Sequence, residues 1–541
     1  MRFYFWSRIK NFFSRSSLLA QRRWLFSTWR PWQACLLLIA VIAIIYGQTL
    51  FFDYTYLDDQ QLILGNAGVL DRANLGEIFF NDVFFSSSKV YYRPLLTWSF
   101  VLDWHWGNGS IFAFHLSNIV FHCLAVCLLF YLLRLIKIKD SSALWLSLFF
   151  AVHPTLVQAV AWIPGRNDSL AAIFIFSALI FLSRWFRQER LRDLIGLWLL
   201  FFAALLTKET AVLLPFLALA WVLIFERPYF SWFKLGLSAA GAAVFGFIWY
   251  LLRIAALGHA SDGVLGQSLL NNLLSPLIFL GKVFLPLNLS VYPVPADSPW
   301  FYGAIAGLLL IALIIVARPR RLTRLFFGLT WFWLILVLGS ARPDGDLFRN
   351  FMEHRLYVPM FGLLLVLAEL EKYFLSWPRR RCQYLLTAVI VIFALLAGRH
   401  AGNFSDRLSF WRQAVASSPH APLAQRNLGA MYYLDGQADQ AEILFRQALA
   451  LNEQEPMAHN NLAAIYIDRG DWWRAEAELK KELEINPNYD LALYNLGRVY
   501  YERRRYQEAA FFWQETLRVN PRHQEAYLKL REAWQKIEDE K

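Results

Sequence analysis

Charged residues are scarce in this chain of 541 residues: Asp, Glu, Lys and Arg together make up 17% of it, against about 25% in ordinary globular proteins. Hydrophobic residues make up 57%. Apolar runs of about 20 residues, the length that crosses about 30 Å of hydrocarbon as a helix, recur from Pro31 to Arg399. This composition excludes a soluble enzyme and a disordered chain, and it predicts an integral membrane protein.

Cysteines and familiar catalytic motifs are also few. The four cysteines fall in or near apolar segments, at Cys35, Cys123, Cys127 and Cys382, which excludes a disulfide-rich secreted scaffold and suits buried packing better than a metal site. The sequence has no Cys/His spacing typical of a metal site, no glycine-rich nucleotide-binding loop and no nucleophile elbow. We therefore expect no nucleotide chemistry on the cytoplasmic side, while a role for a divalent cation stays open.

Eleven apolar runs are predicted to cross the membrane as helices, near residues 32–51, 114–134, 143–161, 169–184, 192–207, 210–225, 233–256, 301–317, 324–341, 355–371 and 384–400. The chain is basic before its first carboxylate, Asp53, so the amino terminus is expected in the cytoplasm. With eleven spans the later basic tracts, RPRRLTR (318–324) and WPRRRC (377–382), also face the cytoplasm. The net charge of +12 therefore indicates topology and not nucleic-acid binding.

The apolar run at 268–287 does not fit this count. Counting it as a twelfth span would turn the basic tracts that follow it to the outside. We therefore predict an interfacial or re-entrant segment on the outer side, broken by Pro276 and Pro286. A twelve-span arrangement is the alternative.

The carboxyl-terminal part has the pattern of a soluble helical repeat. Three related strings stand 34 residues apart, NLGAMYY (427–433), NLAAIYI (461–467) and NLGRVYY (495–501), which is typical of tetratricopeptide repeats. A partial unit precedes them, and a helix at 523–538 is expected as a polar cap. The sequence thus predicts an all-α protein: a basic cytoplasmic segment (1–31), a transmembrane bundle of about eleven spans (32–402) and an exoplasmic tetratricopeptide-repeat α-solenoid (403–541).

An acidic pair follows the first span. Asp58 and Asp59, in YLDDQQ, come about two turns' length after the apolar run, close to the plane of the lipid headgroups. A carboxylate at the bilayer centre costs roughly 2.5–3.5 kcal/mol, so an acid at the headgroup level stays ionised and still reaches a headgroup. Asp58 is a candidate general base for an acceptor hydroxyl, with Asp59 orienting it or binding a cation. The alternative is that Asp59 caps a helix beginning at Gln60 and both acids face water.

Polar and cationic residues accompany the acidic pair in the predicted exoplasmic loops and at the span ends beside them. Arg supplies a bidentate fork and Lys a point charge, so a cluster of such residues can hold a phosphate ester. The candidates are Arg93, His115, His153, Arg166, Asp168, Lys208, Glu209, Glu353, His354 and Arg355.

Several of these candidates have a structural alternative. Arg166 and Asp168 can pair with each other in a turn, and Lys208 and Glu209 can simply form the hairpin between two spans. His153 can be a packing residue whose hydrogen bonds are satisfied. Because ionisable residues at membrane depth are usually functional, we expect some of the set to line a site.

Six strings carry a family resemblance, in this order: YLDDQQLILGN, YYRPLLTWSF, AVHPTLVQAVAWIPGRNDSLAA, LLTKETAVLLP, FLPLNLS and EHRLYVP. Together with the repeats, they resemble the transmembrane and tetratricopeptide repeat-containing O-mannosyltransferases and their bacterial relatives, which are polytopic glycosyltransferases of the C superfamily. The animal members tend to have a second His and a Glu after the His-Pro pair, where this chain has Leu156 and Gln158.

The resemblance implies an inverting glycosyltransferase that uses a polyprenyl-phosphate sugar. By resemblance Asp58 is the base and Asp59 supports it. Contacts with the donor phosphate fall to Arg93, Lys208, His354 and Arg355, and the other candidates line the site. We expect a hexose such as mannose to pass to an exoplasmic protein Ser or Thr, with a lipid or cell-envelope glycan as the alternative acceptor. A non-enzymatic scaffold or transporter is the alternative of another class.

The repeats carry one further pattern. Asn427, Asn461 and Asn495 recur at the same position of successive first helices, so their amides are candidates for a ladder that binds the backbone of an extended acceptor peptide. A purely structural role for these consensus residues is the alternative. We expect a bacterial inner membrane with periplasmic repeats, or an endoplasmic reticulum membrane with the repeats in the lumen.

Overall fold

The computed structural model describes residues 30–72, 75–85, 91–258, 272–287, 289–319, 321–340, 351–374 and 379–540, apart from the side chains of 371–374, 379 and 380. Parts of several predicted features lie outside these residues: the basic segment 1–31, the run at 268–287, and both tracts at 318–324 and 377–382. The described residues form helices and no strand, which confirms the predicted all-α class. The chain divides into two compact units.

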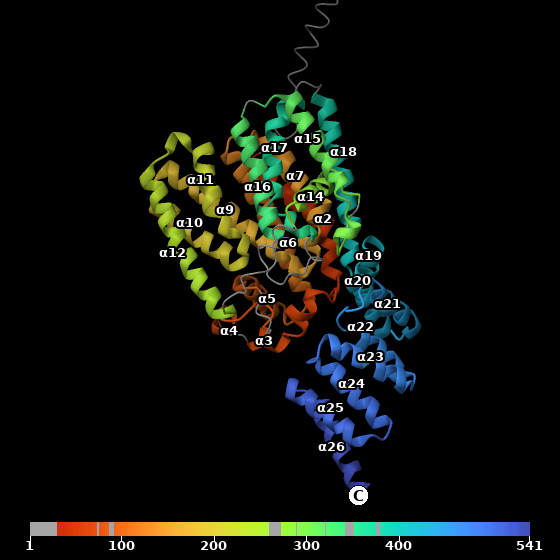
Figure 1. The fold of residues 1–541 in the computed structure, drawn as a ribbon. Helices are drawn as coiled ribbons and strands as arrows, with labels where there is room; N and C mark the ends of the chain where they lie inside the picture. The colour runs from red at the N-terminus through yellow and green to blue at the C-terminus, as the bar shows by residue number, and fades with distance from the viewer. Residues whose placement is uncertain are drawn as a thin grey trace, which may run out of the picture. The chain divides into compact units, whose positions relative to one another are not determined.

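The first unit comprises residues 1–289 and 299–405. Its α-helices, shown in Figure 1, are α2 (Pro31–Tyr46), α3 (Ala67–Arg72), α4 (Leu75–Phe79), α5 (Pro94–Gly107), α6 (Ile111–Leu135), α7 (Asp140–Ala151), α8 (Gln158–Ala161), α9 (Arg166–Gln188), α10 (Leu191–Thr207), α11 (Leu214–Phe225), α12 (Trp232–Leu257), α14 (Ser275–Phe284), α15 (Phe301–Ala317), α16 (Leu322–Ser340), α17 (Met360–Phe374) and α18 (Arg379–Ala401). Short turns join them, of which the site uses η2 (Gln60–Leu64), η4 (Ile163–Gly165), η5 (Glu209–Leu213) and η9 (Glu353–Leu356).

A helix lies at each of the eleven predicted spans, but the helices differ in length. Six are long and apolar enough to cross a membrane, and the bent pair of α7 with the segment Pro154–Ala161 makes a seventh. The other predicted spans are shorter helices, such as α15 and α17. The structure therefore supports a membrane protein, while the count of eleven and the side on which each loop lies stay predictions.

Small residues let helices in this unit approach closely. A Cβ atom on Gly362 of α17 would lie 2.3 Å from the carbonyl oxygen of Gly328 on α16, and one on Gly328 would lie 2.5 Å from that of Gly362. In α14 and α15, a Cβ on Gly303 would lie 1.6 Å from the carbonyl oxygen of Leu277. Such contacts are typical of helices that pack in lipid, where close backbone approach replaces the hydrophobic driving force.

Large apolar side chains remain exposed on the outside of this unit. On α12, Val244, Phe247 and Leu251 are exposed, and on α15 so are Leu308 and Leu309. Contiguous exposed apolar surface is rare on soluble monomers. Lipid can cover this surface. Helices can face lipid because their backbone N–H and C=O groups already hydrogen-bond within each helix.

The second unit comprises residues 290–298 and 406–541. Its helices are α19 (Arg407–Ser417), α20 (Pro422–Leu434), α21 (Ala438–Leu451), α22 (Ala458–Asp468), α23 (Trp472–Ile485), α24 (Asp490–Glu502), α25 (Tyr506–Val519) and α26 (Gln524–Asp539). They form three helix pairs preceded by α19 and followed by α26, in line with the predicted partial unit and cap.

The 34-residue period appears in the packing of each pair. Gly497 of α24 lies against Trp513 of α25, where a Cβ would stand 2.4 Å from the indole Nε1, and Gly429 of α20 lies against Phe445 of α21 in the same way. In the middle pair the equivalent positions are Ala463 and Leu479, so a small residue and a large apolar one recur at this spacing in each pair. The two aromatic side chains are fully buried.

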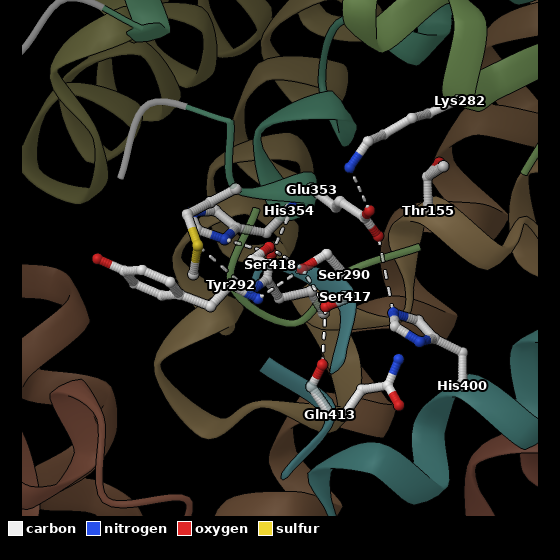
Figure 2. A network of polar contacts seen from close by, with 12 residues as sticks. Thr155, Lys282, Ser290, Tyr292, Glu353, His354, His400, Gln413, Ser417 and Ser418 are labelled. Carbon is white, nitrogen blue, oxygen red and sulfur yellow. Dashed lines mark hydrogen bonds and ion pairs between the residues drawn. The ribbon is translucent and has the colours of Figure 1, made fainter. Parts of the chain in front are cut away.

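The segment Ser290–Ser298 belongs to this second unit, although the sequence placed it in a loop of the membrane domain. The hydroxyl oxygens of Ser290 and Ser417 lie 2.7 Å apart, and the Asp297 carboxylate lies 2.7 Å from Nδ1 of His420 (Figure 2 shows the serine contact). The Tyr292 ring packs at 6.2 Å from that of Trp411. These contacts cover the start of the repeats, which hydropathy alone did not reveal.

Candidate functional site

The turn that carries the acidic pair is held by Asp59. Its carboxylate accepts hydrogen bonds from Thr55 N (2.5 Å), Thr55 Oγ1 (2.9 Å) and Leu57 N (3.0 Å). Burial raises the pKa of the Asp59 carboxyl, and the hydrogen bonds from Thr55 and Leu57 oppose that rise. Asp59 is buried, so the alternative in which both acids face water does not hold for it. Asp58 is half-buried in the same turn.

Within this turn Tyr56 adopts a φ of +59°, a left-handed conformation that is unusual for an aromatic residue. Such strained residues persist only where surrounding contacts hold them, and they gather at functional sites. The three hydrogen bonds to Asp59 provide those contacts and thereby fix the backbone that presents Asp58. A supporting role for Asp59 agrees with this geometry, and the role of Asp58 as a base stays a prediction.

The first loop packs onto the membrane helices through a small core. Leu62, Ile63 and Leu70 of the loop contact Phe100 of α5 and Ile163 of η4. The loop therefore rests on α5 and on the turn η4, which forms a corner between α8 and α9. A Cβ on Gly165 in this corner would lie 2.2 Å from the carbonyl oxygen of Gln158, so the corner closes tightly only with glycine there.

Arg166 is fully buried in this corner and pairs with Asp103 of α5. Its guanidinium also donates to Asn118 Oδ1 (2.7 Å) and to the carbonyl oxygen of Phe114 (2.6 Å). Arg166 and Asp168 do not pair with each other, because residues two apart on a helix point in different directions. Arg166 thus ties α5, α6 and α9 together, which favours a structural role.

Asp168 instead pairs with Lys208. The Lys208 ammonium lies 2.6 Å from Asp168 Oδ1 and both side chains are buried. The neighbouring Glu209 forms an ion pair with Arg93, at 3.0 Å between Oε2 and Nη2. Since Lys208 has an extended backbone (φ −154°, ψ 131°), successive side chains point to opposite sides. The two residues therefore connect separate elements and are more than a hairpin.

The turn η9 brings His354 and Arg355 to the same place. His354 Nε2 lies 3.9 Å from Asp168 Oδ2, an oxygen that accepts no hydrogen bond among the described residues. Arg93 and Arg355 are both within electrostatic reach of Asp168 and of Lys208. The four residues predicted to contact a donor phosphate are thus gathered around one carboxylate. We call Arg93, Asp168, Lys208, Glu209, His354 and Arg355 the cationic cluster.

Glu353 precedes this pair in η9 and has a different set of partners. Its Oε1 lies 2.7 Å from Lys282 Nζ on α14, and its Oε2 lies 3.6 Å from His400 Nε2 on α18, as Figure 2 shows. Burial by itself raises the pKa of the Glu353 carboxyl, but the Lys282 ammonium and the His400 imidazole outweigh it, so the pKa lies below its ordinary value. Glu353 therefore anchors η9 rather than belonging to the cationic cluster.

The two remaining histidines differ. His153 Nε2 lies 3.1 Å from the carbonyl oxygen of Val283 and Nδ1 lies 2.8 Å from Thr155 Oγ1, which favours the packing alternative. His115 is buried against Phe52, and neither of its ring nitrogens has a hydrogen-bond partner among the described residues.

The asparagines of the repeats are half-buried and two of them bind within the chain. Asn427 Oδ1 accepts from Arg426 Nη2 at 2.9 Å, and Asn495 Nδ2 donates to Asn460 Oδ1 at 2.9 Å. The second contact links successive repeats through Asn460, the neighbour of the predicted ladder residue Asn461. Whether the amides, with that of Asn461, also bind a peptide stays a prediction.

Sequence reasoning missed three partners of the candidate residues. Asp103 and Lys282 were not singled out, although both are charges inside apolar runs, a signal that was present in the sequence. The third is Gln158, whose Oε1 lies 3.1 Å from His354 N. No local pattern announces it, because the two residues stand 196 positions apart. In the described ranges no three His, Cys, Asp or Glu side chains gather as metal ligands do.

Comparisons with known proteins agree with the sequence strings. Residues 94–251 match the family described as dolichyl-phosphate-mannose-protein mannosyltransferase, a range that contains Asp168, Lys208 and Glu209. Residues 401–456 and 490–523 match tetratricopeptide repeats. These matches support a place for the chain among the transmembrane and tetratricopeptide repeat-containing O-mannosyltransferases. The matched ranges lie in both the membrane unit and the repeats.

Similar proteins include O-mannosyl-transferases of animals. The chain is 32% identical over 178 residues to the Protein O-mannosyl-transferase Tmtc1 of Drosophila melanogaster, which covers 32% of this chain and 21% of the relative. It is 25% identical over 443 residues to the Protein O-mannosyl-transferase F38B6.6 of Caenorhabditis elegans, and this match covers 75% of the present chain and 61% of the relative. The matched part thus spans less than two thirds of either relative. Among solved structures, that of MamA protein is 20% identical to this chain; the match covers 26% of this chain and 75% of the MamA chain, with a TM-score of 0.23.

Proposed function

We propose that the chain is a membrane glycosyltransferase that moves a sugar, mannose or another hexose, from a polyprenyl-phosphate donor to a Ser or Thr hydroxyl of an exoplasmic protein. The observation that carries the proposal is the gathering of Arg93, Lys208, His354 and Arg355 around Asp168. The family match supports the class of reaction.

The cationic cluster suits a phosphate ester for a physical reason. Guanidinium groups and an ammonium stabilise the oxygen on which negative charge develops as the bond between the sugar and the phosphate breaks, and they do so strongly where water is excluded. Arg93 and Lys208 are mostly buried, so their charges are little screened. The ion pairs with Glu209 and Asp168 hold them in place before a donor arrives.

The nucleophile is the acceptor hydroxyl. We assign Asp58 as the base that takes its proton, so that the oxygen attacks the anomeric carbon from the side opposite the phosphate and the configuration inverts. Asp59 supports Asp58 by fixing their common turn. The repeats, through Asn427, Asn461 and Asn495, present the acceptor chain. The expected setting is a bacterial inner membrane, or alternatively an endoplasmic reticulum membrane.

A scaffold or transporter is the alternative of another class, and the cluster weighs against it. A scaffold has no need for four cationic or polar side chains from three separate elements to converge on one buried carboxylate. Transfer to a lipid or a cell-envelope glycan uses the same cluster, so the acceptor separates that alternative from ours.

The test uses the full-length chain in native membranes, with radiolabelled mannosyl-phosphoryl-polyprenol as the donor probe. We expect label to pass from the donor into protein, with no new labelled glycolipid in the organic-soluble fraction. Asp58→Asn is expected to lower the rate by about 10²–10⁴-fold, the usual contribution of a general base, with expression unchanged. Asp53→Asn is the matched control, because Asp53 is exposed in the same loop. Full activity in the Asp58 variant would remove our assignment of the base.

A further inference from the structure

The hydrogen bonds of Gln158 determine which nitrogen of His354 carries hydrogen. Gln158 is buried at the start of α8, and its Oε1 lies 3.1 Å from the backbone nitrogen of His354 and 3.2 Å from Nδ1 of the same residue. A backbone N–H only donates, so the atom that faces it is the amide oxygen and the amide cannot be flipped. That oxygen only accepts, so Nδ1 must carry the hydrogen.

The other ring nitrogen faces the cationic cluster. Nε2 lies 3.9 Å from Asp168 Oδ2, and the ring rests near Trp162, with centroids 5.6 Å apart. The imidazole therefore has a hydrogen-bond partner at Nδ1, a carboxylate near Nε2 and the Trp162 indole beside the ring. Because Nδ1 is always protonated, a proton can be gained or lost only at Nε2. The charged groups on that side are Arg93, Asp168, Lys208, Glu209 and Arg355, and Glu353 is the remaining charged residue of η9.

We propose that Gln158 is a positioning residue that holds His354 as the Nδ1–H tautomer, and that the proton on Nε2 passes to the departing phosphate. Nothing in the comparisons or the sequence strings assigned Gln158 a role. The tautomer follows from the contacts alone, while the proton transfer rests on the proposed function.

The bond between the anomeric carbon and the phosphate oxygen breaks, and its electron pair goes to that oxygen. The oxygen then takes the proton from His354 Nε2, which leaves a neutral imidazole and a singly protonated lipid phosphate. The proton of the acceptor hydroxyl goes to Asp58 as the new bond to the sugar forms. Water returns protons between turnovers, so no further reactant is needed.

The acid and the leaving group are matched in strength. A phosphate diester carries one negative charge, whereas the monoester that departs has a second pKa of about 6. An imidazolium, at about 6.5 in its ordinary state, can give up a proton to such a group at neutral pH. The Asp168 carboxylate beside Nε2 favours the protonated ring before the donor is cleaved.

The tautomer can be tested without turnover. The full-length chain, labelled with ¹⁵N-histidine and held in detergent, is titrated by NMR, and the His354 signals are assigned by their loss in His354→Asn. We expect the neutral ring to show the Nδ1–H pattern in the wild type and a mixture of tautomers in Gln158→Leu. A neutral wild-type ring with the Nε2–H pattern would overturn the inference, whatever the protein's activity.

The proton transfer is tested by the pH profile of label transfer from mannosyl-phosphoryl-polyprenol to protein. In Gln158→Glu a carboxylate replaces the amide oxygen beside Nδ1, and an opposite charge at this distance raises the pKa of the imidazolium by about 1–3 units. Because the protonated form of His354 is the active one, we expect the basic limb of the pH profile of kcat to move to higher pH by about 1 unit or more. KM for the donor should change little.

Gln188→Glu is the matched control, because Gln188 is exposed at the other end of α9, about 30 Å from Asp168 by the rise of a helix. It should leave the basic limb in place. An active Gln158→Glu variant with an unmoved limb would overturn the proton transfer. If the wild type transfers no sugar, the proposed function fails, and the NMR titration still decides the tautomer.

Discussion

Removing one partner of the buried pair between Lys282 and Glu353 is expected to destabilise the membrane unit strongly, whereas removing both should not. The side chains are 7% and 0% exposed and their charged atoms lie 2.7 Å apart. Breaking a buried pair leaves an uncompensated charge and costs about 3–5 kcal/mol, while replacing both partners with apolar residues of similar volume is often neutral. Lys282→Met and Glu353→Met preserve length and packing.

His400 modifies this expectation. In Lys282→Met the carboxylate keeps a partner in His400, 3.6 Å from Oε2, so we expect the lower end of that range. In Glu353→Met the ammonium stays buried without its carboxylate, and we expect the upper end. The double variant should recover most of the loss, so the coupling free energy should be at least about 4 kcal/mol, half of the roughly 8 kcal/mol expected if the two single losses simply added.

The assay is unfolding of the purified full-length chain in mixed micelles as SDS is added, followed by tryptophan fluorescence. Losses that simply add in the double variant would show that the pair contributes no coupling and that η9 is anchored otherwise.

The stability of the membrane unit should also fall at low pH. Because the pKa of Glu353 lies below its ordinary value, the pair's contribution is present above about pH 4.3 and is lost as the pH falls through the native pKa. The double variant should lack this loss.

Two further predictions concern the helix contacts. Gly362→Ala places a methyl group 2.3 Å from the carbonyl oxygen of Gly328, so the same unfolding assay should show a loss of about 1–3 kcal/mol; Gly236→Ala, with nothing within 4 Å, should show none, and equal results would contradict the close packing. Asp103→Asn leaves the Arg166 guanidinium buried without its carboxylate, and we expect faster proteolysis of the membrane unit, whereas Asp71→Asn, at an exposed residue, should match the wild type.

The helices and the repeats could be predicted because their signals are local. Hydropathy over about 20 residues locates a span, and the spacing of NLGAMYY, NLAAIYI and NLGRVYY needs only the sequence itself. The acidic turn was found for the same reason, since Asp59 binds groups within four residues. Exposure was harder to predict: nothing local indicates that Asp59 is buried, because the loop's core includes Phe100 and Ile163 from distant segments.

The pairings of the charged residues could not be predicted. A turn would have allowed Arg166 and Asp168 to pair, and their place on one helix, α9, shows that they point in different directions. The sequence also does not show that Arg166 meets Asp103 and Asp168 meets Lys208, because those contacts depend on how α5, α9 and α10 pack. For the same reason the set of candidates was found while the contact between Gln158 and His354 was missed.

The charge balance of the cationic cluster links the proposed donor to the proposed proton. Among the described residues, Arg93, Lys208 and Arg355 are opposed by the carboxylates of Asp168 and Glu209, which leaves one positive charge while His354 is neutral. With His354 protonated, as the proposed proton transfer requires, the cluster carries two excess positive charges against the single negative charge of the bound phosphate diester. After cleavage the lipid phosphate tends toward two negative charges, which the protonated cluster balances. A site that gains and loses one proton at Nε2 can therefore bind the donor, stabilise the departing phosphate, and weaken its hold on that product when the proton leaves.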